Sequence, residues 1–140
     1  MSLKIILDSN FLFVPLKFRI DIFKELETVV NRKVEIIVLS PIYEELKVLS
    51  LKDGVNGKEA RIALEYANKC RLIQYETRPN ETIDDFVVRI AEEWRCLVAT
   101  NDRALRKKLR HRNIPVIYLR QKSHLVIYGN LLGREYSSNV

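Results

Sequence analysis

The sequence predicts a single α/β domain with a mainly parallel central sheet flanked by helices. Short runs rich in Ile, Leu and Val alternate along the chain with longer segments of helical periodicity, which is the pattern of successive β–α–β units. No stretch has the Gly-, Pro- or Ser-rich composition of a linker between domains. The chain has 140 residues, of which 47% are hydrophobic, so it is long enough to bury one core.

Five short apolar runs predict the strands of this sheet. Each run is rich in residues that favour strands and is bounded by polar or turn residues. In chain order they are residues 3–7, 35–39, 72–75, 96–100 and 115–119. After Leu119 the pattern weakens. Residues 125–128 are left open as one further strand, and residues 133–140 are expected to form a loose tail.

Five segments between and beside these strands predict helices. In the first, residues 11–31, apolar side chains recur at helical spacing and Pro15 is expected to break or kink the opening turns. The second opens with Ser40 as its cap and Pro41 in its first turn, and ends near Leu49.

The remaining helices are expected at residues 58–69, from Thr82 to Trp94, and at residues 102–111. The first of these follows a loop marked by two glycine turn dipeptides at residues 53–57. Thr82 with Asp85 resembles a capping box. Together the elements define a domain over residues 1–122 and a C-terminal extension over residues 123–140.

Composition narrows the class of protein further. The longest apolar runs, residues 5–7, 11–16 and 36–39, are far shorter than the roughly 20 residues that cross a bilayer. Asp8 interrupts the first run too early for a signal peptide, and Cys70 and Cys96 lack metal-ligand spacing. We therefore expect a cytoplasmic protein with no membrane partner, no disulfide and no zinc site.

Acidic residues gather where the carboxyl ends of the predicted strands would lie, and ligands bind outside this edge in open α/β sheets. Asp8 ends the first strand and Asp102 follows the fourth. Two further acidic pairs at helix starts could reach the same edge, Glu44/Glu45 and Asp84/Asp85. Taken singly, each of these acids could instead be a helix cap or a solvated charge. Together they predict a cation, because clustered carboxylates raise one another's pKa unless a cation neutralises them.

Oxygen ligands without His or Cys favour Mg²⁺ or Mn²⁺ over zinc. Other chemistries find less support, because the chain has no Gly-rich phosphate loop and His111 and His124 lie far from any nucleophile-like serine. Nucleic acid is the favoured partner, since residues 101–122 hold eight basic residues against one acid in a chain of net charge +6. A solvated helix face is the alternative explanation of these charges.

Taken in order, these motifs resemble those of the PIN-domain ribonucleases, and among them the small-subunit rRNA-processing type of archaea and eukaryotes. The first motif corresponds to Ile6-Leu7-Asp8-Ser9-Asn10-Phe11-Leu12, and residues 14–26 are similar to a signature of the rRNA-processing branch. The second, third and fourth motifs and the closing strand correspond to residues 40–46, 84–88, 98–105 and 115–119. The resemblance covers residues 3–122 and implies a PIN-like, Rossmann-like fold.

This resemblance implies a metal-dependent endoribonuclease, whose expected catalytic residues and Mg²⁺ or Mn²⁺ ligands are Asp8, Glu45, Asp85 and Asp102. Glu45 is chosen because it precedes Leu, and Asp85 because apolar residues follow it. Residues expected to orient these ligands or the attacking water are Ser9, Asn10, Asp84, Thr100 and Asn101. Residues expected to bind the RNA backbone share one helix face and are Arg103, Arg106, Lys107 and Arg110.

The expected partner is RNA, in particular an rRNA precursor, and the resemblance also implies a homodimer. Two alternatives within the family stay open: a non-cleaving, RNA-binding PIN domain that acts as a ribosome assembly factor, and a toxin-type PIN ribonuclease. A phosphoryl-accepting receiver domain fits less well, because Asp8 is followed by Ser9-Asn10 rather than by an acid. A flap-type DNA nuclease would share the catalytic chemistry, but the chain lacks obvious insertions for clamping DNA.

Overall fold

The structure is a computed structural model that describes residues 2–131. The tail expected at residues 133–140 lies outside the described residues. Within residues 2–131 no helix combines the length and hydropathy needed to span a membrane.

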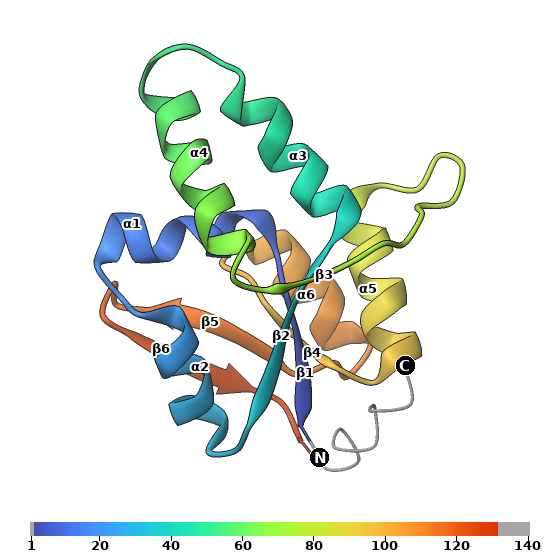
Figure 1. Cartoon of the computed structure of the whole chain (residues 1–140). Coiled ribbons are helices and arrows are strands. Elements are labelled where there is room, and N and C mark those ends of the chain that lie inside the picture. Colours follow the sequence, from blue (N-terminus) through green and yellow to red (C-terminus); the bar gives the residue numbers. More distant parts are fainter. Residues whose placement is uncertain (1, 132–140) are drawn as a thin grey trace.

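A six-stranded sheet forms the centre of the domain, in the order β3-β2-β1-β4-β5-β6 (Figure 1). Its strands are β1 (Leu3–Leu7), β2 (Val34–Leu39), β3 (Arg71–Ile73), β4 (Leu97–Ala99), β5 (Val116–Arg120) and β6 (His124–Tyr128). The four pairings among β1 to β5 are parallel, and only β6 pairs antiparallel, with β5. The α/β fold with a mainly parallel sheet is therefore as predicted. The segment left open after residue 122 adds the edge strand β6.

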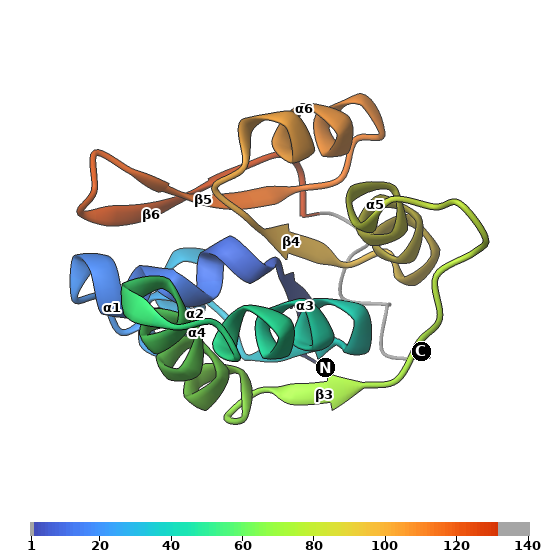
Figure 2. The same ribbon diagram turned by 90° about the horizontal axis from the view of Figure 1, so that it is seen from above.

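Helices cover both faces of the sheet. They are the 3-10 helix η1 (Ser9–Phe13), α1 (Val14–Phe18), α2 (Ile22–Val30), α3 (Ser40–Ser50), α4 (Gly54–Ala67), α5 (Ile83–Trp94) and α6 (Arg103–His111). Seen from above, α5 and α6 lie together on one side of the sheet, while α1, α2 and α4 lie on the other side (Figure 2). Because both faces are covered, every residue of the central strand β1 is buried.

The segment at residues 11–31 was expected to be one helix, broken or kinked at Pro15, but it forms the end of η1 followed by the separate helices α1 and α2. Pro15 lies in the first turn of α1, where its missing N–H leaves no bond unmade. The break comes at Arg19, which ends α1 in the left-handed conformation with φ 55°. Asp21 then caps α2 by accepting a hydrogen bond of 3.2 Å from the Lys24 N–H.

The helix expected at residues 58–69 begins at Gly54, inside the segment expected to be a loop. Gly57 explains the difference, because a Cβ built there would lie 1.8 Å from the carbonyl oxygen of Lys52. This glycine permits α3 and α4 to turn tightly on each other rather than terminating the helix. The resulting α3–α4 hairpin rises above the carboxyl edge of the sheet (Figure 1).

Ser40 lies inside α3 and is not its cap, which is Leu39. Its hydroxyl instead donates to the carbonyl oxygen of Tyr75 at 3.1 Å and accepts from the Tyr75 N–H at 3.0 Å. These two bonds join the start of α3 to the segment that follows β3. They hold together two connections that both leave the carboxyl edge of the sheet.

Candidate active site

Asp8 lies at the end of β1 and is the most buried acid of the carboxyl edge, with only 5% of its surface exposed. Its backbone N–H donates to the carbonyl oxygen of Ala99 in β4 at 3.0 Å. Its carboxylate accepts from the Ser9 N–H at 2.9 Å, from Asn10 Nδ2 at 3.1 Å and from the Thr100 hydroxyl at 2.8 Å. Burial nevertheless raises the pKa of Asp8 to about 6, because these bonds only partly replace water.

The residues that hold Asp8 also join three strands to one another. Asn10 accepts at Oδ1 from the Asn101 N–H at 3.1 Å, and the Thr100 hydroxyl oxygen accepts from the Asp102 N–H at 3.1 Å. Asn101 in turn accepts at Oδ1 from the Leu119 N–H of β5 at 2.9 Å. Four of the residues expected to have supporting roles therefore contact Asp8 or one another, namely Ser9, Asn10, Thr100 and Asn101.

Asp102 caps α6 and remains available at the edge. Its Oδ1 accepts from the N–H groups of Ala104 at 2.8 Å and Leu105 at 3.2 Å. Among the described residues, no hydrogen bond falls on its Oδ2. The helix-cap explanation and the ligand explanation are therefore compatible, because each uses a different oxygen.

The two aspartates at the start of α5 have different surroundings. Asp84 is half-buried, and its pKa is raised first by burial and then by the negative charge of Asp102. Asp85 is exposed, and its carboxylate lies 3.0 Å from Nζ of Lys108, a bond that lowers its pKa. Successive residues of a helix point about 100° apart. The fold therefore turns Asp84 toward the other acids and Asp85 toward α6.

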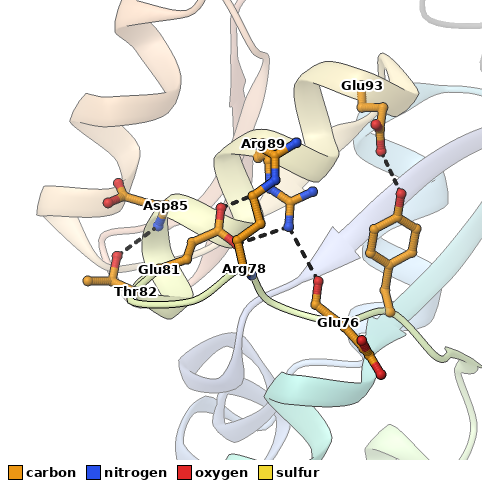
Figure 3. Close-up of polar contacts among 8 residues, drawn as sticks. Glu76, Arg78, Glu81, Thr82, Asp85, Arg89 and Glu93 are labelled. Atoms are coloured by element: carbon orange, nitrogen blue, oxygen red, sulfur yellow. Dashed lines mark hydrogen bonds and ion pairs between the residues drawn. The ribbon is translucent and has the colours of Figure 1, made fainter.

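A hydrogen-bonded loop positions the start of α5 (Figure 3). Arg89 donates from Nε and an Nη to the two carboxylate oxygens of Glu81 at 2.8 and 2.9 Å, and also to the carbonyl oxygen of Glu76. These bonds, together with one from the Arg78 N–H, lower the pKa of Glu81 to about 2. Thr82 caps the helix by accepting from the Asp85 N–H at 3.1 Å, as predicted. The first turn of α5, which carries Asp84, is thus tied to the loop before it.

Glu45 is the member of its pair whose charge acts on the other acids. Its negative charge contributes to the raised pKa of both Asp8 and Asp84. Glu44 instead lines a separate shallow cavity of about 360 Å³ with Ser40 and Tyr75. Both glutamates are exposed, so their side chains are held less firmly than that of Asp8.

The donor set at this edge fits a hard divalent cation in its chemistry, since all of its charged groups are carboxylates. The charges of Asp84 and Glu45 act on Asp8, and those of Asp102, Asp85 and Glu45 act on Asp84. In the arrangement of residues 2–131, no three side chains of the His, Cys, Asp and Glu types are grouped closely enough to hold one ion. A cation here would therefore need the exposed acids to move toward Asp8, or water to complete its coordination.

The basic face of α6 is a second feature of this region. Its cations line a cavity of about 370 Å³ and are Arg103, Arg106, Lys107 and Arg110. Two of them rest on tyrosines that the sequence analysis did not single out: Arg106 lies 4.2 Å from the ring centroid of Tyr118, and Arg110 lies 4.3 Å from that of Tyr128. No local pattern in the sequence relates these two rings, because they lie on different strands. Tyr128 of β6 pairs with Val116, two residues before Tyr118 in β5, so the antiparallel register places both rings on one face of the sheet.

Comparisons with known proteins find relatives of this chain over most of its length. The family described as PIN like domain matches residues 5–122. Ribonuclease VapC4 of Methanocaldococcus jannaschii is 38% identical over 130 residues, which cover 90% of this chain and 97% of that protein. Ribonuclease VapC9 of Archaeoglobus fulgidus is 28% identical over 94 residues, or 65% of each chain.

Solved structures show the same fold. The PIN domain endonuclease Utp24 superposes with a TM-score of 0.74 at 27% identity, over 91% of this chain and 92% of that one. A domain of a functionally unknown protein from M. jannaschii superposes with a TM-score of 0.64 at 16% identity, over 85% of this chain and 92% of that one.

Proposed function

The chain belongs to the family of PIN like domains, and on that basis we propose that it is a metal-dependent endoribonuclease. The observation that carries the proposal is the buried Asp8 carboxylate at the end of β1, which shares the carboxyl edge with the charges of Glu45 and Asp84. An acid of a PIN-like fold kept in so costly an environment is typical of a functional site. The proteins named ribonuclease and endonuclease among its relatives support the same activity.

We assign the catalytic and cation-binding roles to Asp8, Glu45, Asp84 and Asp102, whose charges act on one another at this edge and whose carboxylates are in no ion pair with a cation of the described residues. This replaces the expected Asp85 by its neighbour Asp84, because the Asp85 carboxylate is paired with Lys108. When bound, Mg²⁺ or Mn²⁺ supplies a lowered pKa for water and offsets the negative charge of a phosphodiester transition state.

The chain's own residues would orient the reacting groups. Thr100 and Asn10 hold the Asp8 carboxylate in one orientation, and the capping bonds of α6 use only Oδ1 of Asp102. The cations of α6 would bind phosphates on one side of the scissile bond, with no preference for sequence.

For the substrate we propose an rRNA precursor, in agreement with the signature at residues 14–26. A specific observation favours a second candidate role, that of a toxin-type PIN ribonuclease: the identity of 38% to Ribonuclease VapC4 extends over nearly the whole of both chains. A homodimer and a cytoplasmic location remain part of the proposal.

The test is a cleavage assay with the full-length protein. Labelled precursor rRNA and an unrelated RNA of similar length are incubated with Mn²⁺, with Mg²⁺ and with EDTA, and Asp8→Asn protein serves as the matched control. We expect discrete products that require the metal and Asp8. Products from precursor rRNA alone favour the processing role, and equal cutting of both RNAs favours the toxin-type role. Binding to RNA without any metal-dependent product would reject the nuclease in favour of an assembly factor.

A further inference from the structure

A cavity lies at the far end of α6, away from the carboxylate edge. Its volume is about 310 Å³. Its lining residues come from the end of α6 and the segment after it, and from the end of β6 and the segment after it: Arg110, Asn113, Ile114, Tyr128, Gly129 and Asn130. None of these six residues is acidic, and none has a role in the proposed cleavage chemistry except Arg110.

Two flat groups meet at this cavity. Tyr128 is 54% exposed, so its ring is accessible from solvent. The guanidinium carbon of Arg110 lies 4.3 Å from its ring centroid. Aromatic rings and guanidinium planes are the surfaces on which unpaired bases stack, and such stacking tolerates any base.

The backbone shapes the cavity by a close approach of two segments. Gly129 has φ +123°, and a Cβ built at this position would lie 2.8 Å from Cα of Pro115. Only glycine combines this conformation with this contact. The turn after β6 is therefore held against the start of β5, and Tyr128 is held beside the end of α6.

The cavity continues the basic surface of α6. Arg110 lines both the cavity and the surface formed with Arg103, Arg106 and Lys107. The helix begins at Asp102, one of the four edge acids, and a rise of 1.5 Å per residue places Arg110 about 12 Å further along the axis. A polyanion that follows these cations away from the acids therefore reaches Tyr128.

We propose that a single-stranded RNA runs along α6 from the carboxylate edge and places one nucleobase in the cavity at Arg110 and Tyr128. This inference rests on the proposed function, because it takes the edge acids as the place where the RNA is cut. A single strand is required because paired bases cannot be splayed out to stack on protein side chains.

The experiment measures binding without cleavage. A fluorescein-labelled oligouridine is titrated with full-length protein in EDTA, and fluorescence anisotropy reports the affinity. Tyr128→Ala should weaken binding roughly tenfold, the usual loss for one stacked base. Tyr128→Phe should bind like the wild type, because it keeps the ring, and Tyr128→Leu should bind like Tyr128→Ala, because it keeps only the bulk.

Tyr66→Ala is the matched control. Tyr66 in α4 also lies beneath a cation, with Lys69 Nζ 5.3 Å from its ring centroid, but it lines a different cavity. We expect this variant to bind the oligouridine as the wild type does. Thermal unfolding of each variant checks that it is folded.

A duplex RNA of the same length should be insensitive to Tyr128→Ala, and in the cleavage assay this variant should raise KM with little change in kcat. Unchanged binding of the single strand by Tyr128→Ala, or an equal loss with duplex RNA or with Tyr66→Ala, would overturn the inference. If no RNA is ever cut but the loss in EDTA is specific to the ring of Tyr128, the base-binding cavity stands and the nuclease assignment fails.

Discussion

Two of the acids at the carboxyl edge follow strands and two lie on helices, and the strand-borne pair is held more firmly. Asp8 and Asp102 follow strands, and their backbone N–H groups are bonded to β4 and to Thr100. Glu45 lies in the second turn of α3 and is exposed, and Asp84 lies in the first turn of α5 and is half-buried. One half of the site is therefore rigid and the other is adjustable.

This difference suggests a division of labour. A buried carboxylate such as Asp8 is costly to keep charged, and its orientation is set before any ligand arrives. Exposed acids have little desolvation penalty in the absence of a cation, and their side chains can move toward a cation when it binds.

The largest effect is expected at the strand-borne acid. Asp8→Asn should reduce metal-dependent RNA cleavage by roughly 10³-fold or more, since it removes the charge of the most firmly held carboxylate. Circular dichroism and thermal unfolding should show a folded protein. A folded Asp8→Asn variant that still cuts RNA would falsify the placement of the active site at this edge.

Within the helix-borne half, the two aspartates at the start of α5 should differ strongly. Asp84→Asn should reduce cleavage about 100-fold, because Asp84 is coupled through its charge to Asp102. Asp85→Asn, the matched control, should stay within a few-fold of the wild type, because the Asp85 carboxylate is paired with Lys108. The measurement is kcat/KM on one RNA substrate. Equal losses, or a larger loss for Asp85→Asn, would restore the assignment made from the sequence.

The pH dependence of stability should report the burial of Asp8. Its pKa is raised from 3.8 to about 6, so the folded protein keeps a proton where the unfolded chain has lost it. The stabilising contribution is fully present below pH 3.8 and is lost as the pH rises through 6. In EDTA, the free energy of unfolding of the wild type should therefore fall over this window by about 2–3 kcal/mol relative to Asp8→Asn.

Urea unfolding at closely spaced pH values makes this measurement. Added Mn²⁺ should restore stability to the wild type above pH 6 and give less to Asp8→Asn, because stabilisation by a ligand follows its affinity. Parallel pH curves for the two proteins would show that Asp8 keeps its ordinary pKa.

The smallest effect is expected at the loop that places α5. Arg89→Gln removes the paired hydrogen bonds to Glu81 and should lower kcat up to about tenfold by displacing Asp84. Arg112→Gln is the matched control, since it breaks the exposed pair with Glu92 at the other end of α5. Both variants lose an Arg–Glu pair, but only Arg89→Gln should have a lowered kcat. If they lose equal activity, the loop does not position the site.

Much of the fold follows from local patterns in the sequence. The run at Leu3–Leu7 becomes strand β1 with the same bounds, because five consecutive apolar-rich residues suit only a strand covered on both faces. The sequence also placed Asp8 and Asp102 at the carboxyl edge, because residues that follow parallel strands lie at that edge of the sheet. The capping of α5 by Thr82 was likewise predicted from a local pattern, a threonine followed three residues later by Asp85.

Tertiary contacts decided the rest. From the sequence alone, Gly57 predicts a turn. In the structure it lies inside α4, where only a glycine leaves room for the carbonyl oxygen of Lys52. Asp84 and Asp85 are chemically alike and adjacent, and only the docking of α5 beside α6 turns one toward the acids and the other toward Lys108. Tyr118 and Tyr128 share a face only through the β5–β6 register. Strand ends and helix caps depend on a few neighbouring residues, whereas the direction in which a helix side chain points depends on how the whole helix packs, and that is set by residues far away in the chain.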